Sequence, residues 1–101
     1  MTAAPSDRQG VSIDELPAGT ELEVETSSRT YRLRLLPDGE ASISGHPKYC
    51  PQPVRVKWFG SSLRLSALRL HFLGLGMNLE FQHPVFGVVH TSRIVDVRQT
   101  K

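Results

Sequence analysis

The sequence predicts a single small all-β domain, a barrel of about seven short antiparallel strands with little helix. Two observations predict it: apolar and polar residues alternate with period two along most of the chain, and turn signals separate these segments at short intervals. The chain of 101 residues can bury one modest core without metal or disulfide bonds. We expect residues 1–10 to be a disordered lead and residues 11–101 to form the barrel, whose closure would remove exposed strand edges.

The first predicted hairpin joins strands at residues 20–26 and 29–36 through a polar turn with Ser27 and Ser28 at its tip. One register satisfies both faces of this hairpin, because a slip by one residue would place apolar side chains among the charges. The facing pairs that we expect are Val24–Tyr31 and Leu22–Leu33 on the apolar side, and Glu23–Arg32 and Glu21–Arg34 on the charged side.

A second predicted hairpin brings a strand at residues 40–44 back against the preceding one. Pro37, Asp38 and Gly39 form its turn, for which we expect type I geometry with a glycine bulge. The apolar face continues through the expected pairs Leu35–Ala41 and Leu33–Ile43. Residues 45–53 contain three prolines and predict a stiff, extended loop.

The predicted fourth strand has Val54, Val56 and Trp58 inward and Arg55 and Lys57 outward, and it ends in a turn at residues 60–62. The next segment, residues 63–75, fits both helical and strand spacing, and strict alternation favours strand.

In that segment we expect Leu68, Leu70 and Phe72 to face inward, with a bulge or bend at residues 66–67. Further strands are expected at residues 77–82, 85–90 and 94–97, with a turn at residues 83–84 and another at residues 91–93 that resembles the turn at residues 26–29.

Metal and catalytic chemistry find little support. His46 and Cys50 lie four residues apart, but a zinc site needs three or four ligands and would have to recruit His83 or His90 from elsewhere. Lys48 and His46 beside Cys50 could lower the pKa of its thiol, yet no orienting acid is identifiable. We therefore expect no enzyme activity, no metal and no cofactor, and treat the four histidines as turn or surface residues.

The favoured function is a non-enzymatic binding or interaction module. The loop at residues 45–53 is its candidate site, since prolines fix a loop with little entropy left to lose on binding. The residues that would contact a ligand or partner are His46, Lys48, Tyr49 and Cys50. A partner protein, or self-association through a strand edge, would meet this expectation, and the loop acting only as a cap on the barrel is the alternative.

Single-stranded nucleic acid is a second candidate ligand, because small barrels bind it through basic, aromatic-bearing sheets. The candidate basic face consists of Arg55, Lys57, Arg64 and Arg69. Arg32 and Arg34 are also expected to point outward, but the glutamates opposite would neutralise them. The formal charge of the whole chain is only +2, so the distribution of the charges decides this question.

Two resemblances accompany these predictions. Residues 40–45, Glu-Ala-Ser-Ile-Ser-Gly, loosely resemble the Asp/Asn-x-Ser-x-x-Gly segment of PilZ domains, small bacterial barrels that bind cyclic di-GMP, so the resemblance implies a cyclic-dinucleotide sensor as a third candidate. The PilZ arginine pair upstream has no counterpart, since Arg29, Arg32 and Arg34 have a different spacing.

The segments at residues 26–31, 74–81 and 91–94 are similar to those of small bacterial all-β proteins of unknown function, and this resemblance implies no activity. The expected barrel is SH3-like or PilZ-like.

The expected location is the cytoplasm. The single cysteine cannot form an intramolecular disulfide bond, and the first ten residues lack the basic cluster and apolar segment of a secretory signal. No run of about 18 apolar residues predicts a membrane span.

Overall fold

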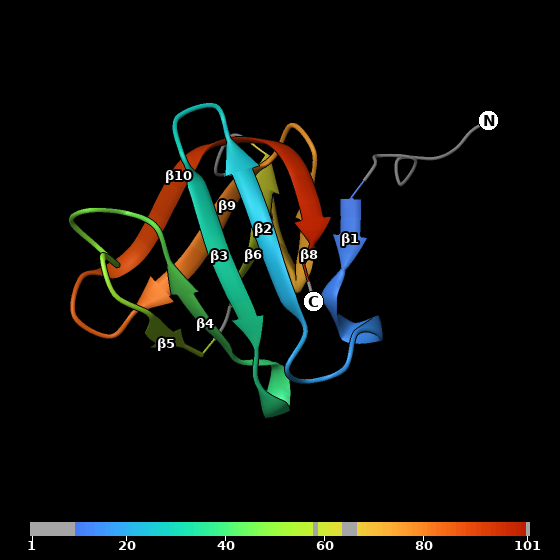
Figure 1. The fold of residues 1–101 in the computed structure, drawn as a ribbon. Helices are drawn as coiled ribbons and strands as arrows, with labels where there is room; N and C mark the ends of the chain where they lie inside the picture. Colours follow the sequence, from blue (N-terminus) through green and yellow to red (C-terminus); the bar gives the residue numbers. More distant parts are fainter. Residues whose placement is uncertain (1–9, 58, 64–66, 101) are drawn as a thin grey trace.

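The computed structural model describes residues 10–57, 59–63 and 67–100, which form an all-β fold (Figure 1). Two short 3-10 helices, Ile13–Glu15 and Pro37–Gly39, interrupt the strands. The strands are β1 (Gly10–Ser12), β2 (Glu21–Thr26), β3 (Thr30–Leu35), β4 (Ala41–Ser44), β5 (Val54–Val56), β6 (Phe59–Leu63), β7 (Ala67–Leu70), β8 (Phe72–Gly74), β9 (Asn78–His83) and β10 (Gly87–Gln99). Within the described ranges, no helix is long and apolar enough to cross a membrane.

Eight of these strands form one antiparallel sheet in the order β5-β4-β3-β2-β10-β9-β6-β7, and β1 pairs with β8 in a small second sheet. The large sheet curls into a barrel-like shape, which confirms the predicted fold class (Figure 1). The predicted closure is incomplete among the described residues: β5 and β7 stand at the two ends of the strand order, and β5 contacts β9 with no described ladder between them.

The predicted register of the first three strands is confirmed at every expected pair. Alternating burial along β2 and β3 explains it, because apolar side chains on one face leave only this alignment. The turn that joins β3 to β4 differs from the prediction. Asp38 has φ 66° and Gly39 has φ 75°, so both residues are left-handed and the turn is not type I.

Residues 60–62 lie within β6, where the sequence predicted a turn. A Cβ at Gly60 would collide with the carbonyl oxygen of Arg69, so the glycine serves the close approach of β7 instead. The hydroxyl groups that made this segment look like a turn are satisfied in the sheet: Ser61 donates to the Phe72 carbonyl, and Ser62 donates to the Glu80 carboxylate.

Strand rather than helix is confirmed in the described parts of residues 63–75, but the orientation predicted for Leu68 and Leu70 is wrong. Pairing sets Leu68 opposite Ser62 and Leu70 opposite Gly60, on the outer face of the sheet, and the two leucines are 41% and 54% exposed. Phe59 fixes this phase, because its buried ring holds one face of β6 in the core. The bend expected at residues 66–67 includes a residue outside the described ranges. Trp58, predicted to face inward, also lies outside them.

β10 is one strand of 13 residues where two were predicted. Residues 91–93 form an irregularity in the β9–β10 ladder, not a turn. Thr91 stabilises it, because its hydroxyl group accepts the N–H of Leu79 and its carbonyl accepts the side-chain amide of Asn78. The likeness to residues 26–29 was therefore misleading.

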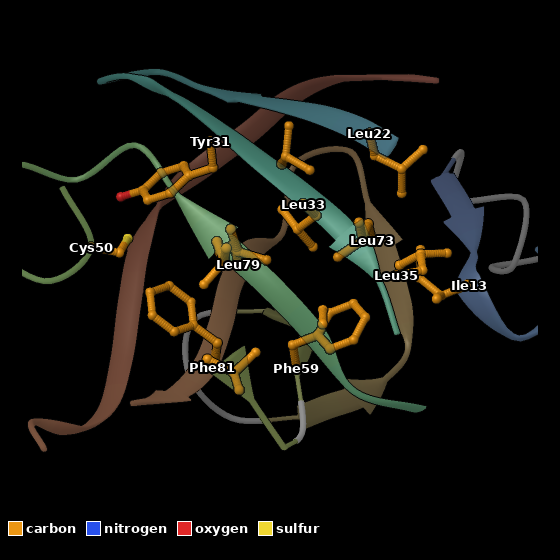
Figure 2. Packing of buried hydrophobic residues seen from close by; sticks show 14 of the residues in the cluster. Ile13, Leu22, Tyr31, Leu33, Leu35, Cys50, Phe59, Leu73, Leu79 and Phe81 are labelled. Carbon is orange, nitrogen blue, oxygen red and sulfur yellow. The ribbon is translucent and has the colours of Figure 1, made fainter. Parts of the chain in front are cut away.

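The core lies inside the curl of the sheet (Figure 2). Phe81 is completely buried in this core: it pairs with Phe59 on one side and Val89 on the other, and its ring meets Tyr31 edge-on at 6.5 Å between centroids. Tyr31 and Cys50 lie together toward one end of the core, next to the proline-rich loop (Figure 2). This end of the barrel carries the candidate site.

Candidate ligand-binding face at one end of the barrel

Two turns with the same sequence pattern, His-Pro-x-aromatic, lie at residues 46–49 and 83–86. In the first, Nδ1 of His46 accepts the backbone N–H groups of Lys48, at 3.1 Å, and of Tyr49, at 3.3 Å. The histidine side chain thus closes the turn as an aspartate or asparagine side chain does elsewhere.

The second turn repeats this arrangement. Nδ1 of His83 accepts the N–H groups of Val85, at 2.9 Å, and of Phe86, at 3.1 Å. Accepting at Nδ1 requires an imidazole without a proton on that atom, so these hydrogen bonds fit the tautomer that carries its proton on Nε2. These two histidines have a structural role, in agreement with the prediction that they are turn residues.

The aromatic rings of the two turns pack on one another. The Tyr49 and Phe86 rings meet edge-on at 5.2 Å, His46 lies 4.6 Å from Tyr49, and His83 lies 4.8 Å from Phe86. We call residues 46–49 and 83–86 the twin-turn face. It joins the predicted loop to the β9–β10 hairpin, 34 residues further along the chain. Phe86 remains 49% exposed, so its ring is available to a ligand.

Positive charge surrounds this cluster. The Lys48 ammonium group lies 5.3 Å from the centre of the Tyr49 ring. The pKa of His46 is lowered by desolvation and then by Arg29 and Lys48, both of them cations. Burial raises the pKa of Tyr31, which lies beneath the cluster, to about 12. The two cations near the cluster, Lys48 and Arg29, favour an anionic ligand.

A groove of about 510 Å³ adjoins the twin-turn face where β5 approaches β9. Its lining residues are Arg55, Lys57, Gln82, His83 and Pro84. His83 belongs to both features, so the groove continues from the aromatic cluster. Arg55 also binds the carboxylate of Glu40, while no described carboxylate lies within ion-pair distance of Lys57.

The structure thus brings the predicted loop residues together with half of the predicted basic face, Arg55 and Lys57. Arg69 does not join them. It is on β7, at the other end of the strand order from β5, and its guanidinium lies 4.7 Å from the centre of the Phe72 ring. Arg64 lies outside the described residues.

Cys50 differs from its predicted role. Its side chain is fully buried, and burial raises the pKa of its thiol, so the lowered pKa proposed from the neighbouring Lys48 and His46 is wrong. Cys50 closes the loop through its backbone, since its N–H donates to the His46 carbonyl and its carbonyl accepts the N–H of Gly45. It anchors the loop from below and does not face a ligand. No group of three or more potential metal ligands occurs in the part of the chain that the structure describes.

The predicted neutralisation of the outer face of β2 and β3 is correct for one arginine. Arg32 pairs with Glu23 at 3.4 Å, and Glu23 also pairs with Arg98. Arg34 lies opposite Glu21 in the ladder but has no ion pair among the described residues. It lines a shallow groove with Ser42, a residue of the PilZ-like segment.

Comparisons of the chain with protein-family models, with curated proteins and with solved structures find no match. The site is therefore interpreted from its own geometry.

The first turn is expected to make stability depend on pH. Because the pKa of His46 is lower in the fold than its ordinary value of 6.5, the unfolded chain binds a proton more readily, and stability should fall as the pH decreases from 7 through 6.5. His46→Asn keeps an acceptor for the turn but does not titrate. Urea unfolding at pH 7 and pH 5 should show a smaller pH effect in this variant than in the wild type, and an equal effect in both proteins would contradict the assignment.

Proposed function

We propose that this protein is a non-enzymatic binding module whose twin-turn face and adjoining groove bind single-stranded nucleic acid. The observation that carries the proposal is the half-exposed ring of Phe86, which packs on the partly buried ring of Tyr49 beside Lys48 and next to the groove that Lys57 lines.

This arrangement suits the two chemical features of a single strand. Unpaired bases present flat rings that stack on aromatic side chains, and each stacked base contributes about 1–3 kcal/mol. The backbone of a single strand carries one negatively charged phosphate for each nucleotide, which lysine and arginine side chains bind. Lys57 lines the groove without an ion pair among the described residues, whereas Arg55 in the same groove is already paired with Glu40, and none of the lining residues that the structure describes is acidic. Phe86 offers the stacking surface, because about half of its surface is accessible.

Binding without catalysis is supported by the same residues. The thiol of Cys50 is buried with a raised pKa, and Nδ1 of His46 is occupied by two backbone donors. The buried thiol is therefore not placed to attack a bound strand, and Nδ1 of His46 is not free to accept a proton from it. We further propose a cytoplasmic location, where a free thiol stays reduced.

The test is fluorescence anisotropy with labelled single-stranded oligonucleotides over a range of salt concentrations. The double variant Lys48→Glu, Lys57→Glu should weaken binding by about tenfold or more, and should reduce the salt slope by about 0.7 for each lost phosphate contact.

The control is Arg34→Glu, Arg93→Glu, which makes the same change in net charge at two exposed arginines outside the twin-turn face. It should bind close to wild type. The absence of binding by the wild type at low salt, or an equal loss in both double variants, would contradict the proposal.

A further inference from the structure

β7 ends the large sheet with one edge unpaired. In the described part of the chain β7 has a ladder only with β6, so the N–H and carbonyl groups on its other edge have no partner strand. Such an edge is a template for another extended chain.

The opposite end of the sheet is protected. Pro53 precedes β5 and has no N–H to donate, β5 is only three residues long, and it contacts β9. β7 has four residues, Ala-Leu-Arg-Leu, and contains no proline. The two sheet ends therefore differ in the features that normally prevent edge pairing.

The outer face beside β7 is apolar. Leu68 and Leu70 are exposed there, and their neighbours across the ladder are Ser62 and Gly60. The carboxylate of Glu80 lies in the same face but is buried, accepts the Ser62 hydroxyl group at 2.6 Å, and lies 3.1 Å from Nε2 of His90. This carboxylate is thus buried and already has hydrogen-bonding partners, so it does not stand free at the edge.

We propose that β7 pairs antiparallel with β7 of a second copy of this chain, which forms a two-fold dimer with a continuous sheet. A two-fold axis at Leu68 sets this residue against its own copy on the outer face and sets Arg69 opposite Ala67. This register sets the exposed Leu68 side chains of the two edges against each other and avoids an arginine facing an arginine. A second copy fits because it supplies an extended edge and an apolar outer face at once.

Light scattering and sedimentation over a range of concentrations test the dimer, whose mass should be twice 11.2 kDa. Leu68→Lys should produce a monomer, because two lysines would meet on the two-fold axis. Val95→Lys is the matched control: Val95 is 50% exposed against 41% for Leu68, and lies on β10. It should remain a dimer.

Amide hydrogen exchange identifies the edge directly. The β7 amides should become protected as the wild-type concentration rises, and should lose this protection in Leu68→Lys. A wild-type monomer at every concentration, dissociation of both lysine variants, or a dimer without added protection of β7 would overturn the proposal. Oligonucleotide binding measured in the same variants keeps this result separate from the proposed function.

Discussion

Phe81→Ala is expected to lower the free energy of unfolding by about 3–5 kcal/mol, the usual range for removing a buried phenylalanine ring. Phe81 is completely buried, pairs with Phe59 and Val89 across two ladders, and touches Tyr31 edge-on. These contacts join β9 to both of its neighbours and to β3. The sheet cannot close over the resulting cavity without breaking its ladders, so the loss should lie toward the upper end of that range.

Urea unfolding followed by circular dichroism measures this effect. The control is Phe86→Ala, which removes the same side chain from a position that is 49% exposed and loses mainly the edge-on contact with Tyr49, worth about 0.5–1.5 kcal/mol. Similar losses in the two variants would show that Phe81 does not hold the centre of the core.

The first three strands could be predicted in register because all the information is local. β2, β3 and β4 follow one another through short turns, and each apolar side chain meets its partner no more than 11 residues away. The later strands depend on pairings between distant segments. β10 joins β9 to β2, and no alternation in residues 87–99 could reveal that one strand spans both ladders with two irregularities.

The wrong orientation predicted for the leucines of β7 also comes from a pairing between separate segments. Its leucines resemble core residues in the sequence, but their face is decided by Phe59 on β6, through a ladder that the sequence did not specify. Gly60 resembled a turn residue for a similar reason: a glycine needed for close backbone approach cannot be distinguished by type from one needed for a bend.

The candidate site was predicted in part. Three prolines marked the loop, and His46, Lys48 and Tyr49 do lie at its surface end. Phe86 and His83 were not predicted as site residues, because they belong to the β9–β10 hairpin, which is distant from the loop in the sequence and meets it only in the fold. The repeated His-Pro-x-aromatic pattern was the available signal, since equal spacing of the same residue types indicated two turns of one design.

Gly45→Ala is expected to destabilise the protein by on the order of 3 kcal/mol and to displace the loop that carries Lys48 and Tyr49. Gly45 has φ 126°, a conformation that residues with a side chain rarely adopt. A Cβ there would also lie 2.5 Å from the backbone oxygen of Thr30, which cannot move without shifting β3. Strain and collision therefore act together at the entry to the loop.

Gly87→Ala separates these two causes, because Gly87 also has a positive φ, 79°, but open space where a Cβ would stand. It follows the second turn as closely as Gly45 precedes the first. We expect it to lose only about 1–2 kcal/mol, the conformational term alone. If oligonucleotides bind through the twin-turn face, Gly45→Ala should also weaken that binding under conditions where the variant is still folded. Equal losses of stability in the two variants would mean that the collision with the Thr30 oxygen adds no cost at Gly45.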